Sequence, residues 1–181
     1  DAIVLFDGKD LSQWQKPQFI FEKGTVDDMK ADVDALDKNY KNPPADWIIE
    51  AGQMVVNPGK GAIETREKFQ DIQLHIEWLS PVDSEKTGQL YSNSGVFLQG
   101  LYEIQILNNY QNQTYANGQA GSVYKQHIPQ VNASRKPGEW QSYDIVFTAP
   151  RFDDRNNILT PAFATVFHNG ILVQNIDNGY G

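Results

Sequence analysis

Hydrophobic and polar side chains alternate along two runs of this chain, as they do in strands that bury one face. In the run 69–79 the apolar side carries Ile72, Leu74, Ile76 and Trp78, and the polar side carries Gln73, His75 and Glu77. In the run 102–107 the apolar side carries Tyr102, Ile104 and Ile106, and the polar side carries Glu103 and Gln105. Each run predicts a strand whose second face holds one carboxylate among hydrogen-bonding groups.

Turn signals separate many short runs of this kind. Gly100-Leu101 joins the run 95–99 to 102–107 as a hairpin, and Asn169-Gly170 joins 163–167 to 171–176. Further strands are expected at 3–6, 19–21, 47–50, 53–56, 62–65, 122–126 and 140–149. The last of these buries either Tyr143, Ile145 and Phe147 or their neighbours. Many short strands between turns predict an all-β sandwich or jelly roll of two antiparallel sheets.

The composition narrows the class of partner. The 181 residues are 40% hydrophobic and 12% aromatic, which is typical of a single globular domain spanning 1–181. The formal charge is −8, from 23 acidic and 15 basic residues, and no Lys/Arg cluster offers a nucleic-acid surface. The sequence has no cysteine and no apolar run as long as a membrane span. Charged residues crowd the segment 26–46, which reads as a surface insertion.

Six segments resemble the 3-keto-disaccharide hydrolase family, whose members have a concanavalin A-like lectin/glucanase sandwich. The segments are 5–14, 69–78, 93–107, 114–121, 131–140 and 165–174. The likeness covers nearly the whole chain in the right order. It implies a carbohydrate-active enzyme that cleaves glycosidic bonds of an oligosaccharide or a 3-keto-glycoside. It also implies location in the bacterial periplasm, on the outer-membrane surface or outside the cell.

The chain departs from the family pattern at two places. Members usually have Arg-Gly just before Asn-Ser-Gly, whereas Tyr91-Ser92 stands there in this chain. Members also usually continue past the region of Gln174 with a closing strand rich in His, Arg and Trp, and this chain ends at Gly181. We therefore expect that the closing segment was lost, that a partner chain supplies it, or that the sandwich closes differently.

Cleavage of a 3-keto-glycoside has defined chemical needs. The ketone makes the hydrogen on C2 acidic, so a base can remove it and expel the C1 substituent, after which water can add. The reaction needs a base, a proton donor and a group that stabilises the enolate. We expect Glu77 and Glu103 to be the acid/base pair in one shared trough, with His75 as a further base or a metal ligand. Substrate-binding candidates are Asn93, Gln99, Gln105, Tyr124 and Trp140, with Tyr110 and Tyr115 as stacking platforms. A divalent metal polarising the ketone is compatible with this chemistry.

Structural explanations compete with each assignment. The two carboxylates are also what a solvated outer face would carry, and His75 also fits a structural role. Asn93 is a common turn residue, and His127 and His168 fall in expected exposed loops.

Three other functions remain open. One is direct hydrolysis by two carboxylates. Another is a non-catalytic glycan-binding module or an accessory subunit of a bacterial envelope assembly. The third is a degenerate structural partner, for which we expect neither sugar binding nor turnover.

Overall fold

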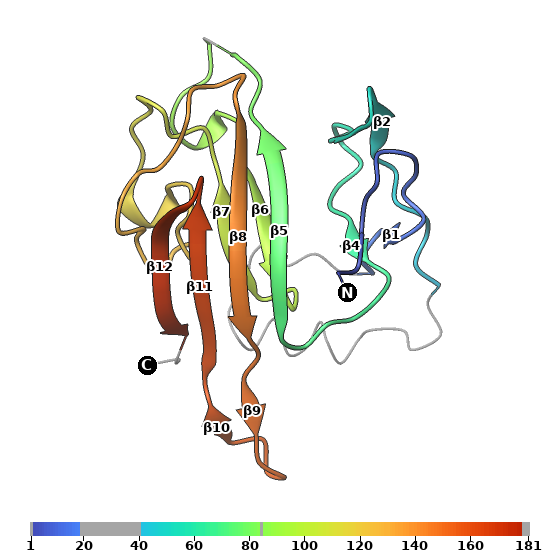
Figure 1. Cartoon of the computed structure of the whole chain (residues 1–181), viewed down its shortest axis with the longest axis vertical. Coiled ribbons are helices and arrows are strands. Elements are labelled where there is room, and N and C mark those ends of the chain that lie inside the picture. The colour runs from blue at the N-terminus through green and yellow to red at the C-terminus, as the bar shows by residue number, and fades with distance from the viewer. Residues whose placement is uncertain (1, 19–40, 84, 179–181) are drawn as a thin grey trace. The chain divides into compact units, whose positions relative to one another are not determined.

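The computed structural model describes residues 2–18, 41–83 and 85–178, and this part of the chain is all-β, as the sequence predicts (Figure 1). Its strands pair antiparallel. The described helices are two short 3-10 turns, η1 (Gly88–Leu90) and η2 (Ala116–Gly118). Neither is long and apolar enough to cross a membrane. The chain divides into two compact units, Asp1–Lys68 and Phe69–Gly181.

Two antiparallel layers build the second unit. One layer is a four-stranded sheet in the order β12-β11-β8-β5. Its strands are β5 (Ile72–Leu79), β8 (Trp140–Thr148), β11 (Ala162–His168) and β12 (Ile171–Asn178). The other layer is the hairpin of β6 (Ser94–Leu98) and β7 (Tyr102–Ile106). A short ribbon of β9 (Arg151–Phe152) and β10 (Ile158–Thr160) extends beyond β8 and β11 (Figure 1).

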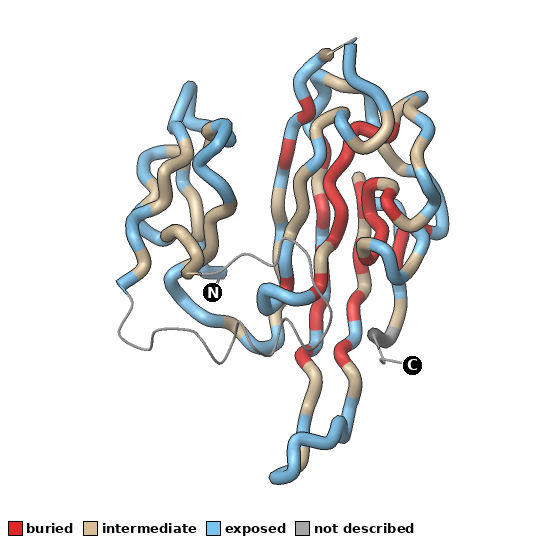
Figure 2. Tube along the Cα trace, turned by 180° about the vertical axis from the view of Figure 1, so that it is seen from behind, coloured by how far each residue is buried: buried red, intermediate tan, exposed pale blue. Residues whose placement is uncertain are grey.

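The core lies between these two layers. Tyr102 of β7 packs on Phe147 of β8 with ring centroids 5.6 Å apart, and both side chains are buried. The Tyr143 hydroxyl of β8 donates a hydrogen bond of 2.6 Å to the Gln105 carbonyl of β7. Buried residues accordingly follow the strands of this unit in Figure 2. Burial of apolar area on both layers is what holds the sandwich closed.

The alternation predicted from the sequence is confirmed in this unit. Ile72, Leu74 and Ile76 pack against the core and Trp78 is buried within it. The sequence left open which face of β8 is buried; Tyr143, Ile145 and Phe147 are the buried residues. The predicted Asn169-Gly170 turn joins β11 to β12, and both residues have the positive φ that this tight hairpin requires.

The first unit contains two small strand pairs. The strands β1 (Trp14–Gln15) and β4 (Glu64–Thr65) form one pair, and β2 (Ile48–Glu50) and β3 (Gln53–Val55) form the other. None of the residues described in this unit is buried.

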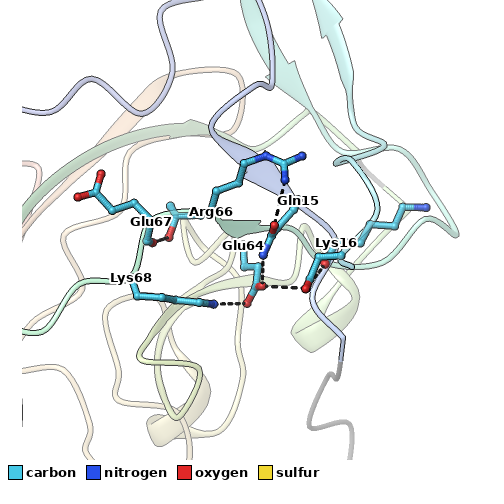
Figure 3. A network of polar contacts seen from close by, with 8 residues as sticks. Gln15, Lys16, Glu64, Arg66, Glu67 and Lys68 are labelled. Atoms are coloured by element: carbon cyan, nitrogen blue, oxygen red, sulfur yellow. Dashed lines mark hydrogen bonds and ion pairs between the residues drawn. The ribbon is translucent and has the colours of Figure 1, made fainter. Parts of the chain in front are cut away.

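Polar contacts join β1 to β4 (Figure 3). Gln15 Nε2 donates to Glu64 Oε1 at 2.7 Å, and Arg66 Nη1 donates to Gln15 Oε1 at 3.1 Å. Lys68 Nζ lies 3.2 Å from the second carboxylate oxygen of Glu64. Hydrogen bonds and ion pairs therefore join the strands of this unit, where no described residue is buried in an apolar core.

Two predicted strands are wrong. Residues 3–6 form no strand, because the Leu5 carbonyl accepts a 2.7 Å hydrogen bond from the Trp14 indole instead of a neighbouring strand. The run 122–126 contributes only isolated bridges at Val123, because the chain turns back there and the His127 N–H bonds the Val123 carbonyl. The predicted strand 19–21 and residues 26–40 of the expected insertion lie outside the described residues.

Candidate functional site

The polar face of the β6–β7 hairpin forms the candidate site. Tyr102 and Ile104 point into the core, so Glu103 points to the opposite side of the hairpin. Phe97 is the partner of Glu103 across β6. On the other edge of β7, Ile104 bridges Val123, and the Tyr124 N–H donates to the Glu103 carbonyl at 2.9 Å. Phe97, Glu103 and Tyr124 therefore form one row across three neighbouring segments.

The Glu103 side chain occupies space that only a glycine at position 95 leaves free. A Cβ atom at Gly95 would lie 2.7 Å from Glu103 Cγ and 2.8 Å from Cδ, which is closer than such atoms approach. The carboxylate therefore lies over the bare backbone of Gly95. A glycine is required here for close approach and not for a special backbone angle.

The environment of Glu103 changes its acidity. The side chain is half-buried, and this burial raises the pKa of its carboxyl from 4.5 to about 7. At neutral pH the group is consequently present in both its acid and its base form, which is the property that a general acid/base needs.

A buried amide lies beside this carboxyl. Gln105 is fully buried, and in one orientation its Nε2 donates to Asn93 Oδ1 at 3.2 Å. In the opposite orientation Nε2 donates to Glu103 Oε1 at 3.0 Å and to the Ser94 carbonyl at 3.2 Å. The amide can thus donate to an ionised Glu103 or accept from a protonated one. Asn93 is fixed in turn by Nδ2, which donates to the Gln89 carbonyl at 3.1 Å.

Two tyrosines complete the group. The Tyr115 and Tyr124 hydroxyl oxygens are 2.6 Å apart, and Lys125 Nζ lies 5.5 Å and 5.6 Å from their ring centroids. We define the Glu103 cluster as the six residues Asn93, Phe97, Glu103, Gln105, Tyr115 and Tyr124. Four of the residues selected from sequence as site candidates, Asn93, Glu103, Gln105 and Tyr124, belong to it, and so does the stacking candidate Tyr115. The other stacking candidate, Tyr110, lies outside the cluster, with Lys136 Nζ 5.9 Å from its ring centroid.

The prediction that Glu77 and Glu103 line one trough is wrong. Glu77 lies on β5 of the four-stranded sheet, on the exposed side opposite the core-facing Ile76 and Trp78. Glu103 lies on the outward side of the other layer, so the core separates the two carboxylates. Alternation fixes the face on which a side chain lies, but strand pairing decides to which sheet that face belongs, and β5 pairs with β8.

Three further candidates also lie away from the Glu103 cluster. His75 shares the outer face of Glu77, where its Nδ1 lies 2.6 Å from Asp144 Oδ1 and both side chains are about half exposed. Trp140 begins β8 on the same face and is 42% exposed. Gln99 is in the β6–β7 turn, at the opposite end of β6 from Asn93, and it is exposed.

The sequence reasoning missed Phe97 as a site residue and misplaced His168. Phe97 lies between the core-facing Val96 and Leu98, so alternation alone puts it on the Glu103 face, where it is 49% exposed. A large apolar side chain on the face opposite Val96 and Leu98 was the signal available in the sequence. His168 was expected in an exposed loop, but it ends β11 and is fully buried. Because His168 lies two residues after Val166 in the strand, both side chains point into the core.

A divalent metal, which the chemistry allows, finds no ligand set in the described part of the chain. No group of three or more His, Asp and Glu side chains gathers there. The His75–Asp144 pair supplies two donors only, on an exposed sheet face. The described residues therefore do not fit a metal site, and the chemistry below uses protein groups alone.

This β-sandwich, with its half-buried carboxyl among amides and aromatic rings, is similar in family and in structure to carbohydrate-active domains of the glycosyl hydrolase or lyase type. The chain belongs to the family described as the 3-keto-alpha-glucoside-1,2-lyase-like domain, which matches residues 1–181. This finding confirms the family resemblance seen in the sequence. No curated protein matches the chain.

Two crystal structures from Parabacteroides distasonis ATCC 8503, both provisionally described as glycosyl hydrolases, are similar to this chain. One shares 43% sequence identity and has a TM-score of 0.79, over 100% of this chain and 70% of that one. The other shares 17% identity and has a TM-score of 0.58, over 98% of this chain and 72% of that one. The second likeness shows the fold alone.

Proposed function

We propose that this chain cleaves 3-keto-glucosides between C1 and the glycosidic oxygen by elimination, with Glu103 as the general base. The observation that carries the proposal is the position of Glu103. Its carboxyl is half-buried over Gly95, beside the amide of Gln105, with the pKa raised to about 7. The family description supplies the substrate class, a 3-keto-α-glucoside.

One carboxylate is enough for the proton transfers of the elimination. Glu103 takes the proton from C2, and the C2–H electron pair moves into the C2–C3 bond while the C3 oxygen becomes an enolate. The enolate then re-forms the ketone, a C1–C2 double bond forms, and the bond from C1 to the glycosidic oxygen breaks. The leaving oxygen takes a proton from the Glu103 carboxylic acid or from water. Addition of water to C1 converts the unsaturated product into the free 3-keto sugar.

The arrangement of carboxylates favours this route over direct hydrolysis. Direct hydrolysis uses two carboxyl groups on either side of the glycosidic bond, roughly 5–9.5 Å apart. The core separates Glu77 from Glu103, so these two cannot act on one bond. Elimination lets one group remove the first proton and return it, which suits a single residue with a pKa near neutrality.

The test uses 4-nitrophenyl 3-keto-α-glucoside and its unoxidised parent. We expect nitrophenol release from the ketone only, with the unsaturated sugar visible by NMR before water adds. Glu103→Gln should lower kcat/KM by about 100-fold or more, the range typical of a lost general base. The matched control is Glu77→Gln, which changes an exposed carboxylate on the other layer and should retain activity. Equal cleavage of the unoxidised glucoside, or full activity in Glu103→Gln, contradicts the proposal.

One observation favours a second candidate, a glycan-binding module without turnover. Phe97 and Tyr115 are 49% and 41% exposed near Glu103, and exposed aromatic rings are a common surface for sugar stacking. Calorimetric binding of oxidised and unoxidised disaccharides, run beside the cleavage assay, separates the candidates. Binding with no product from either sugar supports the module and rejects the enzyme.

A further inference from the structure

The tyrosine pair of the Glu103 cluster lies where a developing negative charge needs a donor. Tyr124 is the neighbour of Glu103 across the sheet, since its N–H bonds the Glu103 carbonyl at 2.9 Å. Val123 points into the core, so Tyr124 points to the same side as Glu103. Side chains paired in this way have Cβ atoms about 5 Å apart. A sugar whose C2 hydrogen meets Glu103 therefore has its C3 oxygen within reach of the neighbouring position.

Tyr115 approaches this position from a different segment and is held there by packing. A Cβ atom at Gly118 would lie 2.6 Å from Tyr115 Cζ, so the ring lies directly against the backbone of η2. The Gly118 carbonyl is fixed by Gln89 Nε2 at 2.8 Å. The rings of Tyr115 and Tyr124 are 6.3 Å apart, with hydroxyl oxygens at 2.6 Å. The pair is therefore built before any substrate arrives.

Resting on the proposed function, we propose that the Tyr124 hydroxyl donates a hydrogen bond to the C3 oxygen of the sugar as it becomes an enolate. Tyr115 is the positioning residue, and its hydroxyl donates to the Tyr124 oxygen. A hydroxyl that accepts one hydrogen bond is polarised and donates its own proton more strongly. Donors arranged in advance around a forming oxyanion stabilise the transition state more than the ground state.

The charges around the pair agree with a donor role. Burial and then the hydrogen bond to Tyr124 raise the pKa of the Tyr115 hydroxyl to about 12, so it keeps its proton at neutral pH. The negative charge of Glu103 acts in the same direction. Lys125 Nζ lies within 5.6 Å of both ring centroids, so a positive charge stands beside the pair and attracts negative charge that develops there.

The experiment compares Tyr124→Phe and Tyr115→Phe, both of which keep the ring and remove the hydroxyl. Each is assayed with 4-nitrophenyl 3-keto-α-glucoside and with a 3-keto-disaccharide, whose leaving group is a poor one. Each is also assayed for exchange of the C2 hydrogen in deuterated water, using 3-keto-1,5-anhydroglucitol, which has no leaving group. The control is Tyr110→Phe, which removes the hydroxyl of a loop tyrosine outside the Glu103 cluster and keeps its ring beside Lys136.

We expect Tyr124→Phe to lower kcat about 100-fold for both glycosides and to slow C2 exchange equally, with KM little changed. Tyr115→Phe should lower kcat about tenfold, and Tyr110→Phe should retain activity. Full activity in both hydroxyl variants overturns the role of the pair while leaving the proposed function intact. A loss confined to the disaccharide shows that Tyr124 protonates the leaving oxygen and overturns the enolate assignment. If the unaltered chain neither cleaves nor exchanges, the proposed function fails first and the inference falls with it.

Discussion

Replacing Glu103 by glutamine should stabilise the fold while removing the proposed catalytic base. In the native state burial raises the pKa of this carboxyl from 4.5 to about 7, so between these values the folded chain binds more protons than the unfolded chain. The contribution of this group to the free energy of unfolding is fully present below about pH 4.5. It is lost as the pH rises from there through about 7, because the buried carboxyl must then ionise. Glutamine has a similar shape and no charge, so the variant avoids this loss.

The size of the effect follows from the pKa values. A change from 4.5 to about 7 corresponds to about 3 kcal/mol against the ionised form, since one pKa unit is about 1.4 kcal/mol. The carboxyl is only half-buried, so water screens part of this cost. A hydrogen bond from Gln105 to the ionised oxygen offsets a further part. We therefore expect the free energy of unfolding of Glu103→Gln, relative to that of the unaltered chain, to rise by about 1–2 kcal/mol from pH 5 to pH 8.

Urea unfolding at pH 5, 6.5 and 8, followed by tryptophan fluorescence, measures this gain directly. Glu77→Gln is the matched control, and because Glu77 is exposed it should stay within about 0.5 kcal/mol of the unaltered chain at each pH. If the stability of Glu103→Gln relative to the unaltered chain does not rise with pH, the carboxyl is not desolvated in the native state. The argument that assigns it acid/base chemistry then loses its physical basis.

Two further predictions concern Gly95 and His168. Gly95→Ala places a methyl group 2.7 Å from Glu103 Cγ, so it should displace the carboxylate. We expect it to lower kcat/KM about tenfold or more and the free energy of unfolding by about 1–3 kcal/mol. A variant with the activity and the unfolding curve of the unaltered chain would contradict this geometry. Burial lowers the pKa of the His168 imidazole from 6.5 to about 4, so only the unfolded chain gains a proton as the pH falls through this range, and stability should drop by up to about 3 kcal/mol. His168→Gln should remove this acid sensitivity, which urea unfolding at pH 7 and pH 4.5 would show; an equal drop in the variant would assign the sensitivity to other groups.

The local part of the structure was predictable because side-chain alternation is a property of the strand itself. Ile104 and Ile106 were expected in the core and are buried, and the polar neighbours Glu103 and Gln105 were expected on the other face. The Asn169-Gly170 hairpin was predictable for a similar reason, since few residues tolerate the backbone angles of that turn. Each of these inferences needs only a few consecutive residues.

The site was only half predictable because it depends on contacts between distant segments. The residues 69–79 do not indicate that β5 pairs with β8, and it is this pairing that places Glu77 across the core from Glu103. The approach of Tyr115 depends on the bare backbone of Gly118, and the approach of Glu103 depends on Gly95 in the facing strand. A glycine in the sequence indicates freedom of the backbone, but not which side chain will occupy the space above it.

Gln105 shows why the site cannot be separated from the core that supports it. Its backbone carbonyl accepts hydrogen bonds from the Tyr143 hydroxyl at 2.6 Å and from the Gly121 N–H at 3.0 Å. Its own N–H donates to the Ser122 carbonyl at 3.0 Å, beside the bridge that brings Tyr124 to Glu103. The same residue thus fixes β7 to the four-stranded sheet, anchors the segment that carries Tyr124, and offers its amide to the carboxylate. Because the side chain and the backbone of Gln105 both make these contacts, the distance between Glu103 and Tyr124 is set by the packing of the sandwich rather than by a flexible loop.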